Sequence, residues 1–174
     1  MSFSATTLAV LIAPSLLALA GFVAVIPAGA QQSLPAAIAT PGAVAIMTAH
    51  AVGAQIYECE TGATGKHGWQ FREPIATLLI DGRTVGRHFV GPSWELADGS
   101  LIVGKAVAHA PGATGDDIPW LKLERAAGGG QFANVSVIQR INTRGGALAG
   151  PCDNVGELTA VPYASDYVFL TKSG

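Results

Sequence analysis

The sequence predicts an all-β protein, a single-domain antiparallel β-sandwich or barrel built from short strands and hairpins. Glycine and proline interrupt the chain often, with 22 Gly and 10 Pro in 174 residues, and the runs between them have the length of strands. Two Asp-Gly pairs, each between apolar runs, are hairpin signals. No stretch beyond residue 42 has the periodicity of an amphipathic helix of three turns. Such a meander of strands buries its apolar faces by closing into a sandwich or a barrel.

Residues 1–30 are expected to be a cleaved signal peptide. They contain no Lys, Arg, Asp or Glu. The apolar run at 15–26 has the length of a signal-peptide core, and Ala28-Gly29-Ala30 gives the small-residue cleavage pattern. The usual basic residue near the start is absent, and an uncleaved membrane anchor is the alternative. A spanning helix needs about 20 apolar residues, and Pro14 and Pro27 leave fewer than that between them. We therefore expect a secreted or periplasmic protein with no membrane span after cleavage.

Residues 31–42 form a Pro/Ala-rich segment expected to lie extended on the surface or to be partly disordered, and residues 43–174 are expected to form a single β-rich domain. The first clear alternation is VGAQIYECE at 52–60, which a Gly-rich loop follows. Pro74 then separates WQF from IATLLI. Because proline cannot donate a hydrogen bond to a neighbouring strand, it indicates an edge or a bend at this point.

The two Asp-Gly pairs define the next strands. Asp81-Gly82 joins LLI to TVGRHFV, and Asp98-Gly99 joins WEL to LIVGKAVAH. We expect Asp98 to be the first residue of a type I′ turn, with its carboxylate bonded to the local backbone. An exposed loop is expected at 111–119. Three further strands are predicted after it, in the runs WLKLER, FANVSVIQRIN and DYVFL. The aromatic and β-branched residues of DYVFL favour a strand.

The two cysteines, Cys59 and Cys152, are expected to form a disulfide, because an even pair in an exported chain is most simply paired. Two free thiols and half of a metal site are the alternatives, although neither cysteine has a second Cys or a His at the spacing of a metal motif. The formal net charge of −2 at pH 7 leaves no basic stripe to neutralise phosphates. We therefore expect no nucleic-acid partner.

Six segments of the chain also occur together in one known family: GAQIYEC, WQFREPIATL, GRHFVGPSWELADGS, IPWLKL, VIQRINTRGG and VPYASDYVF. In content and order they resemble the exported family catalogued as domain of unknown function 3455, found in bacteria and fungi. The resemblance covers about 53–169, and it implies no activity, since no reaction is established for the family. Some fungal members carry the name malate dehydrogenase. This chain has no G-x-G-x-x-G after a strand and no βαβ pattern to support that name.

The stretch HFVGPSWELADGS carries the first candidate ligand-binding residues, His88, Trp94 and Glu95. Tryptophans displayed beside polar side chains suit sugar stacking, whereas tryptophans that brace a β-core are buried. Trp120, next to a proline, raises the same two alternatives. Arg140 ends a strand near a Gly-Gly turn, where a guanidinium can bind a carboxylate or simply solvate the edge.

His88 and Glu95 are also the candidate acid and base of a hydrolase-like enzyme, the first alternative function. For each, a structural role is the competing interpretation: a hydrogen-bonded histidine within the fold, and a solvated glutamate on its outer face. Ser93 lies in GPSWE, which is not the G-x-S-x-G nucleophile motif. We interpret it as a turn hydroxyl.

The evenly spaced His67, His88 and His109 suggest the second alternative, a metal-dependent protein. Three imidazoles on strands stacked in register could hold one metal and leave a fourth position open. No single element supplies two ligands, however, so we expect no metal site and no cofactor. The sequence favours a binding or structural module at the cell surface, with a carbohydrate or another small molecule as its candidate ligand.

Overall fold

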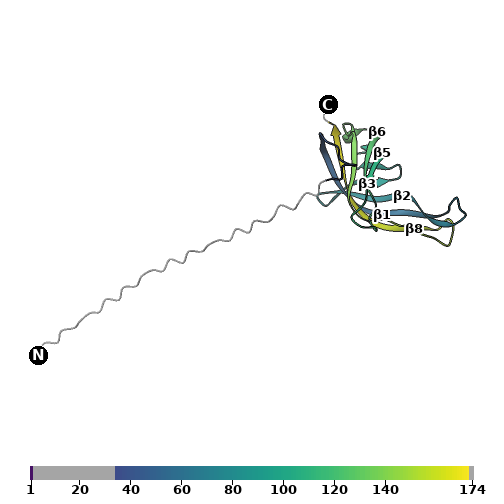
Figure 1. Cartoon of the computed structure of the whole chain (residues 1–174). Helices are drawn as coiled ribbons and strands as arrows, with labels where there is room; N and C mark the ends of the chain where they lie inside the picture. The colour runs from purple at the N-terminus through teal and green to yellow at the C-terminus, as the bar shows by residue number, and fades with distance from the viewer. Residues whose placement is uncertain (2–33, 173–174) are drawn as a thin grey trace. The chain divides into compact units, whose positions relative to one another are not determined.

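Eight antiparallel strands close into a barrel in chain order, with β8 returning to pair with β1. The structure is a computed structural model that describes Met1 and residues 34–172, so the expected signal peptide lies outside the described residues except for Met1. The all-β prediction is confirmed, and of the two expected architectures the barrel is the one observed (Figure 1). The elements are β1 (Ala43–Thr61), β2 (His67–Ile80), β3 (Arg83–Phe89), β4 (Ser93–Leu96), β5 (Leu101–Ala110), β6 (Trp120–Gly128), the 3-10 helix η1 (Gly130–Phe132), β7 (Val137–Gly145) and β8 (Leu158–Lys172).

The two Asp-Gly pairs form different turns. Asp81 and Gly82 have φ angles of 50° and 73°, as a two-residue type I′ hairpin between β2 and β3 requires. At the second pair only Gly99 has a positive φ, of 84°, and the turn is closed by a hydrogen bond from the Leu96 N–H to the Ser100 carbonyl. The expected type I′ position of Asp98 is therefore wrong, because the loop between β4 and β5 is longer than two residues.

The Asp98 carboxylate does bond the local backbone, as expected. It accepts hydrogen bonds from the Ser100 N–H at 2.9 Å and from the Gln131 amide at 2.8 Å. These bonds, the Gln131 side chain first, lower the pKa of Asp98. The carboxylate thus links the β4–β5 turn to η1.

Three strands, β1, β2 and β8, are longer than the rest and extend together to one side of the barrel (Figure 1). Near the end of this extension Cys59 and Cys152 form a disulfide, with their Cα atoms 5.9 Å apart and 93 residues apart in sequence. The bond attaches the segment before β8 to β1. Backbone hydrogen bonds that join Cys59 to Gly156 and Glu157 attach the same segment. The expected pairing of the cysteines is confirmed.

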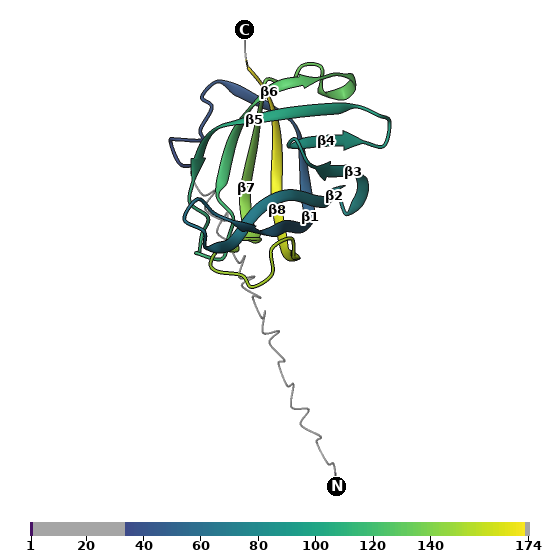
Figure 2. The same cartoon turned by 90° about the vertical axis from the view of Figure 1, so that its right-hand side faces the viewer.

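The core fills the inside of the barrel. Cross-strand partners point to the same side of a sheet, and the pairs Ala76–His88 and His88–Trp94 place these three side chains on the inner face of β2, β3 and β4. On the other side β7, β8 and β1 run side by side (Figure 2). The largest fully buried side chains of the core cluster are Trp94, Tyr167, Phe132, Phe169, Leu78, Ile102, Leu123 and Ile138.

The described part of the Pro/Ala-rich segment, residues 34–42, makes a turn instead of running extended throughout, and it packs on the outside of the barrel. Ile38 is fully buried in a small cluster with Trp120 and Ala110. Its carbonyl accepts a hydrogen bond of 2.7 Å from the buried Gln139 amide. This segment covers β6 and β7. Among residues 34–172, no helix is long and apolar enough to cross a membrane.

Candidate functional site

His88, the first candidate residue, lies on the inner face of β3. Its side chain is buried, with 2% of the residue exposed. The imidazole stacks on the indole of Trp94, with 4.6 Å between ring centroids and 12° between planes. The ring of Tyr167, from β8, lies 4.8 Å from it at a tilt. Strands from both sides of the barrel therefore hold the imidazole in place.

The protonation state of His88 follows from its burial together with its hydrogen bond to Ser93. Its Nδ1 lies 2.8 Å from the Ser93 carbonyl oxygen. A carbonyl only accepts, so Nδ1 carries the proton and Nε2 is left as an acceptor. Burial lowers the pKa of His88 to about 4; the bond to Ser93 opposes this shift, and the charge of Arg140 adds to it. The imidazole is therefore neutral at physiological pH.

A cavity of about 330 Å³ opens beside His88. Pro74 of β2, Leu121 and Leu123 of β6, and Arg140 of β7 also line it. Because β2 and β6 are not neighbours in the ring, their side chains meet across the inside of the barrel. Several other lining residues, Phe71, Val90 and Ala106, are exposed, so the cavity is an open mouth of the barrel.

Arg140 is one of two arginines that line this cavity, the other being Arg72. Cross-strand pairing places Arg140 between Leu121 on β6 and Tyr167 on β8. Its Nε and Nη2 atoms both donate to the Pro119 carbonyl, at 3.0 and 2.8 Å. No carboxylate in the described part of the chain forms an ion pair with it. The guanidinium is thus fixed in position without being neutralised.

Several polar side chains are buried within the fold, among them Gln55, Thr143 and Ser165. Burial raises the pKa of the Tyr163 phenol, and the neighbouring Tyr167 adds to the effect. Polar atoms buried in this way normally have hydrogen-bond partners. Within residues 34–172, buried polar atoms without a hydrogen bond of normal geometry belong to Gln55, Trp94, Thr143, Tyr163, Ser165 and Tyr167 among others. The inside of the barrel is therefore not purely apolar, although none of these side chains lines the cavity beside His88.

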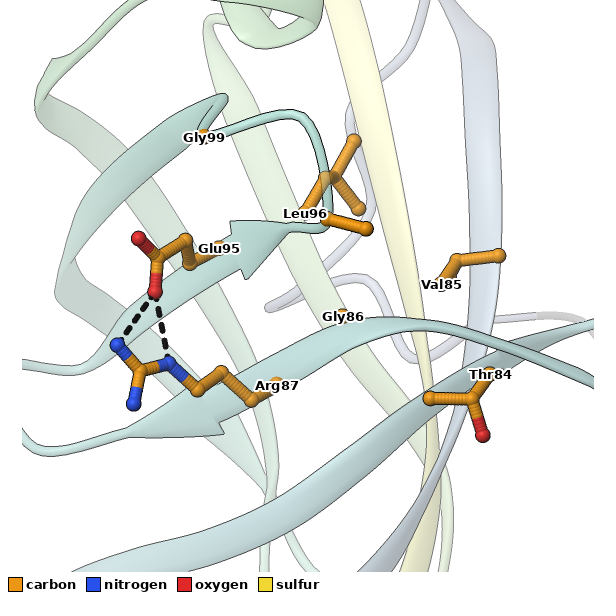
Figure 3. A pocket seen from close by; sticks show the side chains of 8 residues that line it. Thr84, Val85, Gly86, Arg87, Glu95, Leu96 and Gly99 are labelled. Atoms are coloured by element: carbon orange, nitrogen blue, oxygen red, sulfur yellow. Dashed lines mark hydrogen bonds and ion pairs between the residues drawn. The ribbon is translucent and has the colours of Figure 1, made fainter.

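Glu95 lies on the opposite face of the sheet from His88 and Trp94, because neighbouring residues of a strand alternate. On this outer face it accepts hydrogen bonds from the Nε and Nη2 atoms of Arg87, at 2.7 and 2.6 Å. The pair borders a surface groove of about 460 Å³ that Thr84, Gly86 and Leu96 also line (Figure 3). The structure thus separates Glu95 from the other two candidates of its stretch.

The tryptophans do not form an exposed binding face. Trp94 is 1% exposed and Trp120 is 7% exposed, so both are buried instead of being displayed on the surface for a sugar. Trp120 alternates with the cavity-lining Leu121 and packs under Ile38 on the outside of the barrel. Of the five candidate ligand-binding residues, only His88 and Arg140 line the cavity.

The three evenly spaced histidines are not brought together. His67 and His109 are exposed, at the start of β2 and near the end of β5, whereas His88 is buried. The residues that the structure describes contain no group of three or more His, Cys, Asp or Glu side chains placed to hold a metal ion.

Sequence reasoning missed the apolar wall of the cavity. Leu121 and Leu123 alternate with charged Lys122 and Glu124, a pattern that predicts one buried face. That pattern could have identified the inner face of this strand. It could not show that Pro74 of β2 lies across the cavity from these leucines, because the closure of the ring decides which distant strands face each other. At Ser93, for which the sequence predicts a turn hydroxyl, it is the backbone carbonyl oxygen that bonds His88.

Comparison with known proteins identifies a family. Residues 40–171 match the family described as "Protein of unknown function (DUF3455)". No curated protein and no solved structure matches the chain. The match begins before β1 and ends one residue short of the end of β8, so it spans all eight strands of the barrel. The chain therefore belongs to the DUF3455 family of proteins of unknown function.

Proposed function

We propose that this protein is an exported binding module that holds a small, largely apolar molecule in the mouth of its barrel. The observation that carries the proposal is the open cavity of about 330 Å³ between His88 and Arg140. Ligand sites are commonly concave and apolar, with a few fixed polar groups. Here Leu121, Leu123 and Pro74 supply the apolar wall. This composition favours a ligand less polar than a carbohydrate.

His88 suits ligand recognition better than acid/base catalysis. A general acid or base works best with a pKa near the operating pH, and burial lowers the pKa of His88 to about 4. The other candidate, Glu95, lies on the outer face and is paired with Arg87. A neutral imidazole fixed by Ser93 instead supplies one hydrogen-bond acceptor, Nε2, to a bound molecule.

Export is supported by two features. The Cys59–Cys152 disulfide is of a kind that persists in oxidising compartments outside the cytosol. The expected signal peptide at residues 1–30 would direct the chain there. A secreted or periplasmic binding module is consistent with both.

A matched pair of variants tests the proposal. Ala106 lines the cavity at its exposed rim, and Lys105, the preceding residue of β5, is exposed and does not line it. Ala106→Trp should fill the mouth and abolish binding of the hits from a fragment library screened by NMR against the disulfide-bonded mature protein. Lys105→Trp should leave their binding unchanged. Hits that bind Ala106→Trp as well as wild type would overturn the proposal.

A further inference from the structure

We infer that the ligand is a small monocarboxylic acid, with its carboxylate on the Arg140 guanidinium and its apolar body along Leu121 and Leu123. The inference rests on the proposed function, because it assigns a chemical class to the molecule in the same cavity. The carboxylate assignment depends on the charge and geometry of Arg140. A binding site in the cavity does not by itself require them.

A partly buried cation lowers its free energy by pairing with an anion. The other arginine that lines this cavity, Arg72, has such partners: Glu58 at 3.6 Å and Glu73 at 3.3 Å. Arg140 has none among residues 34–172, since its Nε and Nη2 atoms donate to the neutral carbonyl of Pro119. A ligand anion would supply the missing counter-charge.

The two bonds to Pro119, of 3.0 and 2.8 Å, occupy one edge of the guanidinium and fix its plane. They leave Nη1 and the second N–H of Nη2 to donate to another acceptor. Two parallel N–H donors on one edge match the two oxygens of a carboxylate. Because the side chain is already ordered, little conformational entropy is lost on binding.

Arg140 is the only unpaired cation of the described cavity lining, and His88 is neutral and presents an acceptor. A phosphate dianion would bring more negative charge than one guanidinium balances. The rest of the wall is mainly apolar, with Pro74, Leu121 and Leu123. A single carboxylate on an aliphatic or aromatic body satisfies the charge and the wall together.

Matched acids and amides test the inference on the disulfide-bonded mature protein. The probes are 3-phenylpropionate, hexanoate and benzoate, each beside its neutral amide of nearly the same shape. We expect at least one acid to bind wild type with a dissociation constant at least about tenfold below that of its amide. Arg140→Gln should raise the dissociation constant of the acid by at least about tenfold and leave that of the amide unchanged.

Arg144→Gln is the control, since Arg144 is an exposed arginine of the same strand that does not line the cavity. It should leave both affinities unchanged. If Arg140→Gln fails to fold, the acid-to-amide ratio of wild type decides the question without any variant.

The outcomes separate this inference from the proposed function. Equal binding of acid and amide, or equal loss of both in Arg140→Gln, would overturn the carboxylate assignment. The binding site itself would stand if the substitution Ala106→Trp still abolished binding of the probes. No binding of any acid at millimolar concentration would also overturn the assignment, and the fragment screen with Ala106→Trp would then judge the proposed function separately.

Discussion

The imidazole of His88 lies flat against the indole of Trp94, with 4.6 Å between ring centroids and 12° between ring planes. The two residues are cross-strand partners on β3 and β4, so the register of the sheet sets the stack. Of the two, only His88 lines the cavity. Trp94 lies on the core side, where it forms a T-shaped contact with Tyr167, with 5.0 Å between ring centroids. The stack thus forms the boundary between the core and the mouth of the barrel.

Stability should fall with acidification through the titration of His88. Its pKa is lowered from 6.5 to about 4 in the folded protein, so the unfolded chain binds more protons between these values. Stability is therefore fully present above about pH 6.5 and declines as pH falls toward about 4. Between about pH 7 and pH 5 the free energy of unfolding should drop by roughly 2 kcal/mol from this residue. Urea unfolding at the two pH values measures it.

The matched variant for this prediction is His88→Phe, which keeps an aromatic ring beside Trp94. We expect it to be destabilised overall, because the bond to Ser93 is lost, but to show a smaller decrease between the two pH values. A pH dependence equal to that of wild type would assign the effect to other groups. An NMR titration that gave His88 an ordinary pKa would contradict the prediction directly.

Gly86 should tolerate no side chain, because β3 approaches β4 closely there. A Cβ atom at this position would lie 2.1 Å from the Glu95 carbonyl oxygen and 2.9 Å from the Leu96 Cα. Both are backbone atoms that cannot turn aside. Gly86→Ala should lower the free energy of unfolding by about 3 kcal/mol. Gly115→Ala is the control, since nothing lies within 4 Å of a Cβ there, and it should change the thermal midpoint little.

Removing the disulfide should destabilise the protein without changing its fold. The bond closes a loop of 93 residues, for which the chain-entropy estimate is about 4–5 kcal/mol and measured losses are typically about 2–5 kcal/mol. The double variant Cys59→Ala/Cys152→Ala should unfold at lower urea than wild type. Wild type treated with a reductant should move to the same midpoint. Coinciding midpoints for oxidised and reduced wild type would contradict the prediction.

Glu95→Gln should have little effect on stability. The ion pair with Arg87 is well formed, at 2.6 Å, but the Arg87 side chain is 69% exposed, and exposed pairs contribute about 0–1 kcal/mol. We expect a loss below about 1 kcal/mol and unchanged binding of fragments that occupy the cavity. A large loss of binding in Glu95→Gln would move the functional site to the outer groove of Figure 3.

The sequence predicted the strands better than their closure. Alternation and the Asp81-Gly82 pair located β2, β3 and their hairpin, because these signals are local. Closure depends on β1 pairing with β8, a contact between the two ends of the domain that no local pattern specifies. The same limit applies to the site: alternation places His88 and Glu95 on opposite faces, but only the ring brings Arg140 to the side of His88.

The most direct test of a ligand in the barrel mouth is a set of intermolecular NOEs between a bound acid and the methyl groups of the protein. For the tightest binder among the matched acids, we expect NOEs from its apolar protons to the methyl groups of Leu121 and Leu123, which line the cavity. They should disappear in Ala106→Trp. NOEs to Val85 and Leu96, which line the outer groove, with none to Leu121 or Leu123, would contradict the account.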